Sequence, residues 1–313
     1  QSSQFGKNIV SLLFNRVALI GIGLIGSSLA RAIRDNKLAN KIAVASRSAS
    51  TLEKARKLDL GDIYTSDCAL AVEKCDLVVI CTPLGAYKSI AKSIAGTLKN
   101  GAIVTDVGST KMCVKKYIKP YLPKTVHLVP GHPVAGTEKS GPENGFSELF
   151  QQRWCILTPD KSTNELAVER VANLWRCIGM TVEFMSASHH DQILSITSHL
   201  PHLIAFTVVG TASGLEEKLR REVIKFSASG FRDFTRIAAS DPTMWRDIFL
   251  ENRIAVLEML DRFSNNLDSI REAIRKNDGD ALYEMFEKTQ NKRKQIIEAR
   301  QHIPEEQKVI RHK

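Results

Sequence analysis

The sequence predicts an α/β domain followed by an all-α domain, and three observations lead to this prediction. With 313 residues, the chain is long enough for about two domains. Fourteen of its 18 glycines and seven of its 10 prolines precede residue 186, so turns between short elements concentrate there. Before that point apolar runs alternate with helical patterns, and after it only helical spacing remains. We therefore expect domains at 14–185 and 186–303, with flexible ends at 1–13 and 304–313.

In the first domain, strands and helices alternate as in a parallel sheet that carries helices on both faces. The helical patterns lie near residues 24–36, 50–58, 85–98, 110–119 and 163–178. The apolar runs that we expect to form strands are Val17–Ile20, Ile42–Ala45, Leu77–Cys81, Ile103–Thr105, Val126–Val129, Trp154–Leu157 and Thr181–Phe184.

The second domain shows helical periodicity throughout. Apolar residues step by three or four from Ile254 to Ile274, which predicts one face of a long helix, and a further helical stretch covers about 280–301. Such helices must bury their apolar faces against other helices, either within the chain or in a partner subunit.

The composition is that of a globular protein. Hydrophobic residues make up 43% of the chain and charged residues 25%, which excludes wholesale disorder and fibrous classes. No apolar run approaches the ~18 residues of a membrane-spanning helix, so we expect no membrane partner. The formal net charge of +10 suits anionic small molecules as well as nucleic acid. Because no basic run is interleaved with aromatic residues, we expect no nucleic-acid partner.

The cysteines indicate a cytoplasmic protein. There are six, none in a C-x-x-C spacing, and reduced thiols are the simplest account of them. Residues 1–13 also lack the basic region and the long apolar core of a signal peptide.

A glycine-rich loop follows the first predicted strand and opens an amphipathic helix, which is the context that dinucleotide binding requires. The first glycine permits a tight turn, the second lets the backbone approach a pyrophosphate, and the third lets helix and strand pack closely. The pyrophosphate charge would then lie at the N-terminus of the helix. We therefore expect a Rossmann-like dinucleotide-binding domain. The expected cofactor contacts in this loop are Gly21, Gly23, Leu24, Ile25 and Gly26.

The end of the second strand bears on the choice of cofactor. An acidic residue there would bind the ribose 2′-hydroxyl of NAD, but this chain has Ser46-Arg47-Ser48. Arg47 with its flanking serines can instead bind a 2′-phosphate, so the pattern favours NADP, with NAD still open. Thr82 and Pro83 should also border the cofactor, because ligands bind at the carboxyl ends of such strands.

Two further polar segments, 106–111 and 131–138, also follow strands and so fall on the same rim as the glycine loop. His132 stands between Gly131 and Pro133, which predicts a tight turn, and its pKa near neutrality suits proton transfer. Ser109 could hydrogen-bond this histidine or the substrate. We regard His132 as a candidate general base, with a capping or core histidine as the alternative.

The second domain offers His189-His190-Asp191 and, further on, Ser198 to His202. His199 and His202 are three residues apart, which places them on one face of a helix. That spacing can ligate a metal. We favour a polar edge that contacts the substrate and expect no metal. Because Pro201 suggests a helix start, one of the histidines could also be only a cap.

Arg236 stands just before Asp241-Pro242, which predicts the N-cap and first position of a helix. Its neighbours are apolar, and burying an arginine without a partner is expensive. Arg236 therefore needs an anion, and a substrate carboxylate or an internal aspartate would serve equally.

Taken together and in order, five motifs resemble the prephenate/arogenate dehydrogenase family (cyclohexadienyl dehydrogenases) of tyrosine biosynthesis. The resemblance covers about residues 14–300. It implies oxidative decarboxylation of prephenate and/or arogenate with hydride transfer to NAD or NADP, giving 4-hydroxyphenylpyruvate and/or tyrosine. The motifs are the glycine loop, Asp106–Lys111, Gly131–Gly141, Ser198–His202 and Asp233–Arg236.

The resemblance also implies roles for individual residues. His132 would accept a hydrogen bond or proton from the substrate 4-hydroxyl, Ser109 would orient both groups, and Arg236 would bind a substrate carboxylate. It further implies a homodimer formed through the helical domain, whose partner subunit can contribute to the pocket. Other matches around the substrate pocket are Ser198, His199, His202, Glu138 and Trp245.

Two alternatives stay open. A 3-hydroxyacid dehydrogenase also joins a nucleotide domain to helices, but it typically relies on a lysine in the helical half. A catalytically silent NAD(P)-binding sensor would keep the glycine loop without needing His132, Ser109 and Arg236 together.

Overall fold

The computed structural model describes residues 12–215, 222 and 229–298. It divides into two compact units between Val256 and Leu257. Apart from Leu12 and Leu13, the expected flexible ends lie outside the described residues. The predicted fold class is confirmed, because a parallel sheet with helices is followed by helices.

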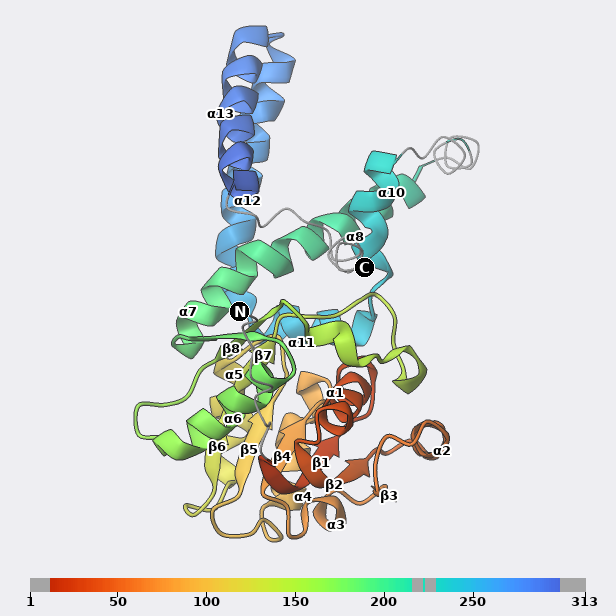
Figure 1. Cartoon of the computed structure of the whole chain (residues 1–313). Helices are drawn as coiled ribbons and strands as arrows, with labels where there is room; N and C mark the ends of the chain where they lie inside the picture. The colour runs from red at the N-terminus through yellow and green to blue at the C-terminus, as the bar shows by residue number, and fades with distance from the viewer. Residues whose placement is uncertain (1–11, 216–221, 223–228, 299–313) are drawn as a thin grey trace, which may run out of the picture. The chain divides into compact units, whose positions relative to one another are not determined.

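Six parallel strands form the main sheet of the first unit, in the order β3-β2-β1-β4-β5-β6 (Figure 1). The order reverses beside β1, so the loops after β1 and β4 lie at the switch point where α/β folds bind ligands. The short β3 was not expected from the sequence, because three residues show no periodicity. The strands are β1 (Phe14–Ile20), β2 (Ala39–Ala45), β3 (Ile63–Thr65), β4 (Leu77–Ile80), β5 (Ile103–Asp106) and β6 (His127–Val129).

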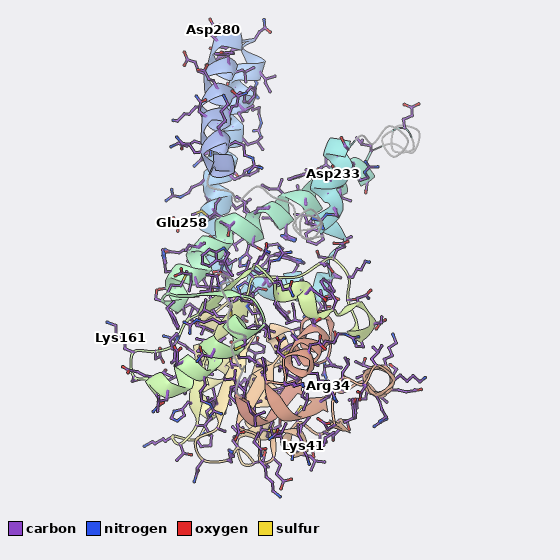
Figure 2. The ribbon with its side chains drawn as sticks, viewed as in Figure 1. Arg34, Lys41, Lys161, Asp233, Glu258 and Asp280 are labelled. Atoms are coloured by element: carbon purple, nitrogen blue, oxygen red, sulfur yellow. The ribbon has the colours of Figure 1, made fainter. Side chains whose placement is uncertain are left out.

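Helices cover both faces of this sheet, as predicted. Alternate strand residues point to opposite faces, so Val17 and Leu19 pack in one core while Ala18 and Ile20 pack in the other. The first core includes α1 (Leu24–Asp35), α2 (Ala49–Lys57) and α6 (Glu165–Cys177). The second includes α3 (Cys68–Val72), α4 (Tyr87–Ile94) and α5 (Met112–Tyr117). Charged side chains such as Lys41 and Lys161 project from the outside (Figure 2).

The prediction of one parallel sheet is wrong for the last strands. β7 (Gly131–Pro133), β8 (Trp154–Leu157) and β9 (Thr181–Phe184) form a second sheet, in which β7 and β8 are antiparallel. Pro130 separates β6 from β7, and because proline has no N–H it cannot continue the ladder of β6. The chain therefore leaves the main sheet just before His132.

A continuous helical stretch follows in the first unit. It consists of α7 (Ala187–Leu194), the π-helical turn η5 (Ser195–His199) and α8 (Leu200–Ser213). As predicted, an α-helix begins beside Pro201, which lies in the first turn of α8, but the π turn η5 joins this helix directly to α7, and His199 at the N-cap position makes no side-chain cap hydrogen bond. Proline cannot donate to the preceding turn, and the wide π turn lies where the regular pattern breaks. Beyond it come α10 (Ser229–Thr235), the 3-10 turn η6 (Arg236–Ala239) and α11 (Pro242–Glu251).

The same stretch corrects the expectation about membrane-length segments. The helix Ala187–Ser213 is 27 residues long, and its apolar 18-residue window has a mean hydropathy of 1.5, which is long and apolar enough to cross a membrane by these measures alone. Serine, threonine and histidine interrupt the apolar run, so no uninterrupted segment stands out in the sequence. A helix that is buried between subunits satisfies the same measures.

The second unit contains most of α12 (Arg253–Arg275) and α13 (Gly279–Glu298), close to the predicted bounds. Asp278 caps the start of α13 by accepting a hydrogen bond from the Ala281 backbone N–H at 3.0 Å. Several large apolar side chains are exposed on these helices, which is unusual for a pair of helices in water. They are Leu257, Leu267, Ile274, Tyr283 and Phe286.

Candidate active site

The glycine loop has the geometry that its spacing predicts. Gly21 has φ +92°, and a Cβ there would lie 2.9 Å from the Cys81 backbone. A Cβ on Gly26 would lie 2.2 Å from the Gly21 carbonyl oxygen, so helix and strand can approach only because this residue is glycine. A Cβ on Gly23 would meet nothing within 4 Å. The second glycine therefore borders open space.

The start of α1 lacks a side-chain cap. Gly23 stands at the N-cap, and Leu24 and Ile25, both partly buried, begin the helix. The N–H groups of this first turn therefore offer hydrogen bonds and a positive dipole end to an anion. Thr82, next to Gly21, has a buried hydroxyl with no hydrogen-bond partner among the described residues, and Pro83 follows it. These features fit a dinucleotide.

Ser46, Arg47 and Ser48 follow β2, which neighbours β1 in the sheet. The Ser48 hydroxyl accepts a hydrogen bond from the Thr51 N–H at 3.2 Å and so caps α2. Arg47 is exposed and makes no ion pair within the described part of the chain. Its guanidinium is thus available for an external anion.

His132 lies in β7, buried among ionisable groups. Its Nδ1 forms a 2.8 Å hydrogen bond with Nε2 of His190, and Nδ1 of His190 forms a 2.7 Å hydrogen bond with Oδ1 of Asp191. Burial holds the pKa of His132 well below its usual value, and His190, Lys111 and His199 lower it further. The predicted tight turn is wrong, because His132 pairs with Ile156 in a short strand. The ring is therefore held neutral on a rigid element.

Ser109 lies on the loop after β5, half-buried. No hydrogen bond joins the Ser109 side chain to His132 among the described residues. Burial lowers the pKa of the nearby His199 to about 4, and a hydrogen bond with the Ser109 backbone opposes this lowering.

A buried ion pair supports the strand of His132. Lys111 and Asp106 are both fully buried, and the Lys111 Nζ donates to Asp106 Oδ2 and to the Gly131 carbonyl oxygen, each at 2.5 Å. Asp106 also accepts from the Tyr87 hydroxyl at 2.8 Å and from the Gly108 N–H at 2.9 Å. A buried charge pair is tolerated where such bonds satisfy it.

His199, His202 and Trp245 form an aromatic cluster. The Trp245 ring stacks on His202 with centroids 3.8 Å apart, and it meets His199 edge-on at 6.1 Å. The Ser198 carbonyl oxygen accepts a hydrogen bond from Nδ1 of His202 at 2.9 Å. Trp245 is buried, and its indole N–H has no hydrogen-bond partner in the described residues. Buried donors usually have a hydrogen-bond partner, so this indole N–H can accommodate a polar group from outside the described residues.

Arg236 pairs with Glu138 across 2.9 Å. Burial lowers the pKa of His202, and the charge of Arg236 lowers it further. The expectation of a buried Arg236 is wrong, because its side chain is 59% exposed. The 3-10 turn η6 places it at the surface despite its apolar neighbours. Its internal anion is a glutamate on the loop after β7 rather than an aspartate.

Five residues of the network received no role from the sequence: Asp106, Lys111, His190, Asp191 and Asn252. The Asn252 Nδ2 donates to the Asp191 carbonyl oxygen at 2.8 Å and to His199 Nδ1 at 3.0 Å, so it connects α7 to His199. The signal for His190 and Asp191 was their place in the run His189-His190-Asp191. Asn252 carried none, since its partners lie more than 50 residues away. In the residues described, no cluster of three His, Cys, Asp or Glu could hold a metal ion.

A glycine loop at the carboxyl edge of a parallel sheet, with a buried histidine network on neighbouring elements, defines a dinucleotide-dependent dehydrogenase. Residues 29–184 match the family described as "Prephenate dehydrogenase, nucleotide-binding domain", and residues 186–288 match "Prephenate dehydrogenase, dimerization domain". The chain belongs to the prephenate dehydrogenase family.

Individual relatives agree with this assignment. The chain is 44% identical to the cyclohexadienyl dehydrogenase of Zymomonas mobilis over 90% of its own length and 96% of that protein. It is 35% identical to the prephenate dehydrogenase of Bacillus subtilis, over 86% of this chain and 73% of the relative. The crystal structure of Aquifex aeolicus prephenate dehydrogenase with hydroxyphenyl propionate and NAD+ is similar, with a TM-score of 0.83 and 34% identity over 90% of this chain and 98% of that one.

Proposed function

We propose that this protein oxidatively decarboxylates prephenate and/or arogenate, with hydride transfer to NAD(P), and so forms 4-hydroxyphenylpyruvate and/or tyrosine. Family membership supports the reaction class, and the relative named a cyclohexadienyl dehydrogenase supports both ring substrates. The observation that supports it most is the state of His132. It is buried and neutral, and only Nδ1 of its two nitrogens is hydrogen-bonded within the described residues. Its Nε2 is left to act on a substrate hydroxyl.

In this reaction His132 would hold the proton of the substrate 4-hydroxyl for a short time. When bound, the dinucleotide would supply the acceptor for the hydride that leaves C4 of the ring. The 4-hydroxyl then becomes acidic, and its proton passes to Nε2 of His132 while the Ser109 hydroxyl orients the oxygen. Carbon dioxide leaves C1, and its electron pair aromatises the ring and arrives at the oxygen. His132 returns its proton to that oxygen, so no net proton is consumed.

The substrate carries carboxylates, and we assign their binding to the residues around the aromatic cluster. Arg236 would bind one carboxylate in competition with Glu138, its present partner. The indole N–H of Trp245, which has no hydrogen-bond partner in the described residues, would donate to a polar substrate atom beside His202. His199 and Ser198 would complete this wall of the pocket. The basic balance of the chain favours the approach of a polyanion.

For the cofactor we propose the glycine loop with Thr82 and Pro83, and we favour NADP because Arg47 has no internal partner in the described residues. Ser46 and Ser48 would contribute hydroxyls to a 2′-phosphate, although Ser48 already caps α2. A bidentate arginine contact to phosphate is the strongest interaction available at this position.

The assembly we propose is a cytoplasmic homodimer, with no nucleic-acid or membrane partner. We place the functional boundary at 185/186 and the dimer contact within 186–303. The match to a dimerization domain over 186–288 supports this proposal, and so do the exposed apolar side chains on α12 and α13. The apolar helix over 187–213 falls within the same region, where a partner subunit rather than lipid would bury it.

The test is the initial rate of NAD(P)H formation by the purified chain in a two-by-two grid of prephenate or arogenate against NAD or NADP. We expect turnover in at least one combination, and higher rates with NADP than with NAD. Absence of turnover in all four combinations, with the dinucleotide still bound, would contradict the proposal and return attention to a hydroxyacid substrate or a sensor.

A further inference from the structure

The hydrogen bonds around His132 form one buried chain with a definite direction. It runs from the Asp191 carboxylate to His190 and from His190 to His132, over 2.7 Å and 2.8 Å. The two histidines come from elements 58 residues apart, α7 and β7, and all three side chains are buried.

The direction follows from valence. The Asp191 carboxylate can only accept, and it accepts from the backbone N–H groups of Lys111 at 2.8 Å and Met112 at 3.0 Å as well as from His190. His190 must therefore donate from Nδ1. A neutral imidazole has one N–H, so Nε2 of His190 is an acceptor, and the Nδ1 of His132 must donate to it. The lone pair of His132 is thereby confined to Nε2.

The rings of His132 and His190 are both neutral at neutral pH. Burial lowers the pKa of His190 and outweighs the opposing effect of Asp191. Burial also lowers the pKa of His132, and the positive charge of Lys111 acts in the same direction on both rings. The chain therefore starts with one proton on each histidine and can take up one more.

Lys111 holds both ends of this chain. Its Nζ donates to the carbonyl oxygen of Gly131, directly before His132, and its backbone N–H donates to Asp191. The base and the carboxylate are thus fixed to one residue, which is itself paired with Asp106. Small shifts of α7 against β7 are resisted at both ends.

We propose that His190 and Asp191 are positioning residues that hold His132 in the tautomer with its proton on Nδ1. The proposal rests on the proposed function only for its kinetic consequence. When Nε2 of His132 takes the proton of the substrate hydroxyl, the new O···H–N bond replaces O–H, and the ring becomes cationic. The Asp191 charge stabilises that cation through His190. Without this pair, His132 could carry its proton on Nε2, where it would donate to the hydroxyl instead of accepting from it.

The direct test is the protonation pattern of the His132 ring, measured by 15N–1H NMR on protein labelled at histidine nitrogens. We expect a protonated Nδ1 and a bare Nε2 at pH 7 in the substrate-free enzyme, with the signals assigned by their loss in His132→Asn. A proton on Nε2 would overturn the proposal. This result does not depend on which substrate the enzyme uses, so it stands apart from the two-by-two rate test.

Variants at position 190 give the kinetic arm. His190→Gln keeps a carbonyl oxygen that can accept from His132 Nδ1, whereas His190→Leu offers no acceptor. We expect His190→Leu to lose a large part of the ~10²–10⁴-fold that a general base contributes, mainly in kcat, and His190→Gln to recover at least ~10-fold of that loss. His189→Leu is the matched control, since the neighbouring His189 is exposed, and it should keep the wild-type rate.

A fold defect is excluded by dinucleotide affinity, which should be the same in all three variants. Equal rates for His190→Leu and His190→Gln, with unchanged dinucleotide affinity, would contradict the tautomer argument. So would an unaltered His132 ring pattern in His190→Leu.

Discussion

At the glycine loop the chain offers backbone N–H groups and open space, whereas around His132 it packs ionisable side chains against one another. A Cβ on Gly23 would meet nothing within 4 Å, while Lys111, Asp106 and His190 are fully buried. The loop has no side-chain cap and its neighbour Thr82 has an unpaired hydroxyl. In the His132 network, by contrast, the charged groups are hydrogen-bonded to each other and to the backbone.

The difference corresponds to two tasks. A cofactor that enters and leaves needs donors that are free until it binds, and a helix N-terminus provides them without any charged side chain. A base that takes a proton within the reaction needs its orientation and charge state set beforehand. The network is therefore shielded from solvent and preorganised, and we expect each residue in it to be sensitive to replacement.

The largest expected effect separates the two regions completely. His132→Asn should lower kcat by ~10²–10⁴-fold, because it removes the group to which we assign the substrate proton. Dinucleotide affinity, measured by fluorescence quenching, should change less than about 2-fold, a change worth under ~0.5 kcal/mol. An unchanged kcat would remove His132 from the mechanism.

The reverse separation comes from the loop. Gly26→Val places side-chain atoms against the Gly21 carbonyl, which a Cβ alone would approach to 2.2 Å. Overpacking of ~1–3 kcal/mol predicts dinucleotide affinity weaker by about 5–150-fold. Gly96→Ala is the control, because a Cβ there meets nothing within 4 Å, and it should bind normally. Equal affinity in both variants would contradict the close packing of α1 on β1.

Acid should weaken the histidine network before it affects the loop. Burial lowers the folded-state pKa of His199 to about 4, while Asp191 opposes this effect and His190 and His202 add to it. An unfolded histidine titrates near ~6.5, so below that pH the unfolded chain binds a proton that the folded chain does not. Stability is thus lost as the pH falls from 6.5 toward 4, by up to ~1.4 kcal/mol per pH unit.

Thermal melting at pH 8, 7, 6 and 5 measures this loss. We expect Tm to be level between pH 8 and 7 and to fall below 6.5, with a shallower fall in His199→Gln and an unchanged one in His189→Gln. A level Tm down to pH 5 would mean that these histidines are not buried as described.

The smallest effect concerns cofactor choice. Arg47→Ala removes the guanidinium that we assign to the 2′-phosphate, and a lost charge-assisted bond of ~1.5–3 kcal/mol predicts a KM for NADP higher by about 10-fold or more. The KM for NAD should stay within about 2-fold, since NAD has no such phosphate. Lys41→Ala is the matched control, because Lys41 is an exposed cation in β2, the strand that precedes Arg47 (Figure 2). A parallel rise for both cofactors would contradict the assignment.

The two regions also differ in how far the sequence predicts them. The glycine loop is a local motif, and its turn, its helix and its close packing all follow from six consecutive residues. The strand-helix alternation likewise predicts the six-stranded sheet, although the three-residue β3 escapes it. The second sheet escapes it too, because the departure of β7 depends on pairing with β8, more than 20 residues later.

The His132 network depends on contacts that no local pattern encodes. His132 meets His190 across 58 residues, and Lys111 meets Asp191 across 80. The sequence singled out His132 for its setting between glycine and proline, yet that setting is a strand and not a turn. Arg236 shows the opposite error, since its apolar neighbours suggested burial where a short 3-10 turn exposes it.

The proposed reaction couples one oxidation and one decarboxylation at His132. The most direct measurement is the ratio of carbon dioxide released to NAD(P)H formed, with prephenate or arogenate labelled at the ring carboxylate. We predict a ratio of one throughout the time course, with both products lost together in His132→Asn. Reduced dinucleotide without carbon dioxide, or carbon dioxide without reduced dinucleotide, would contradict the account.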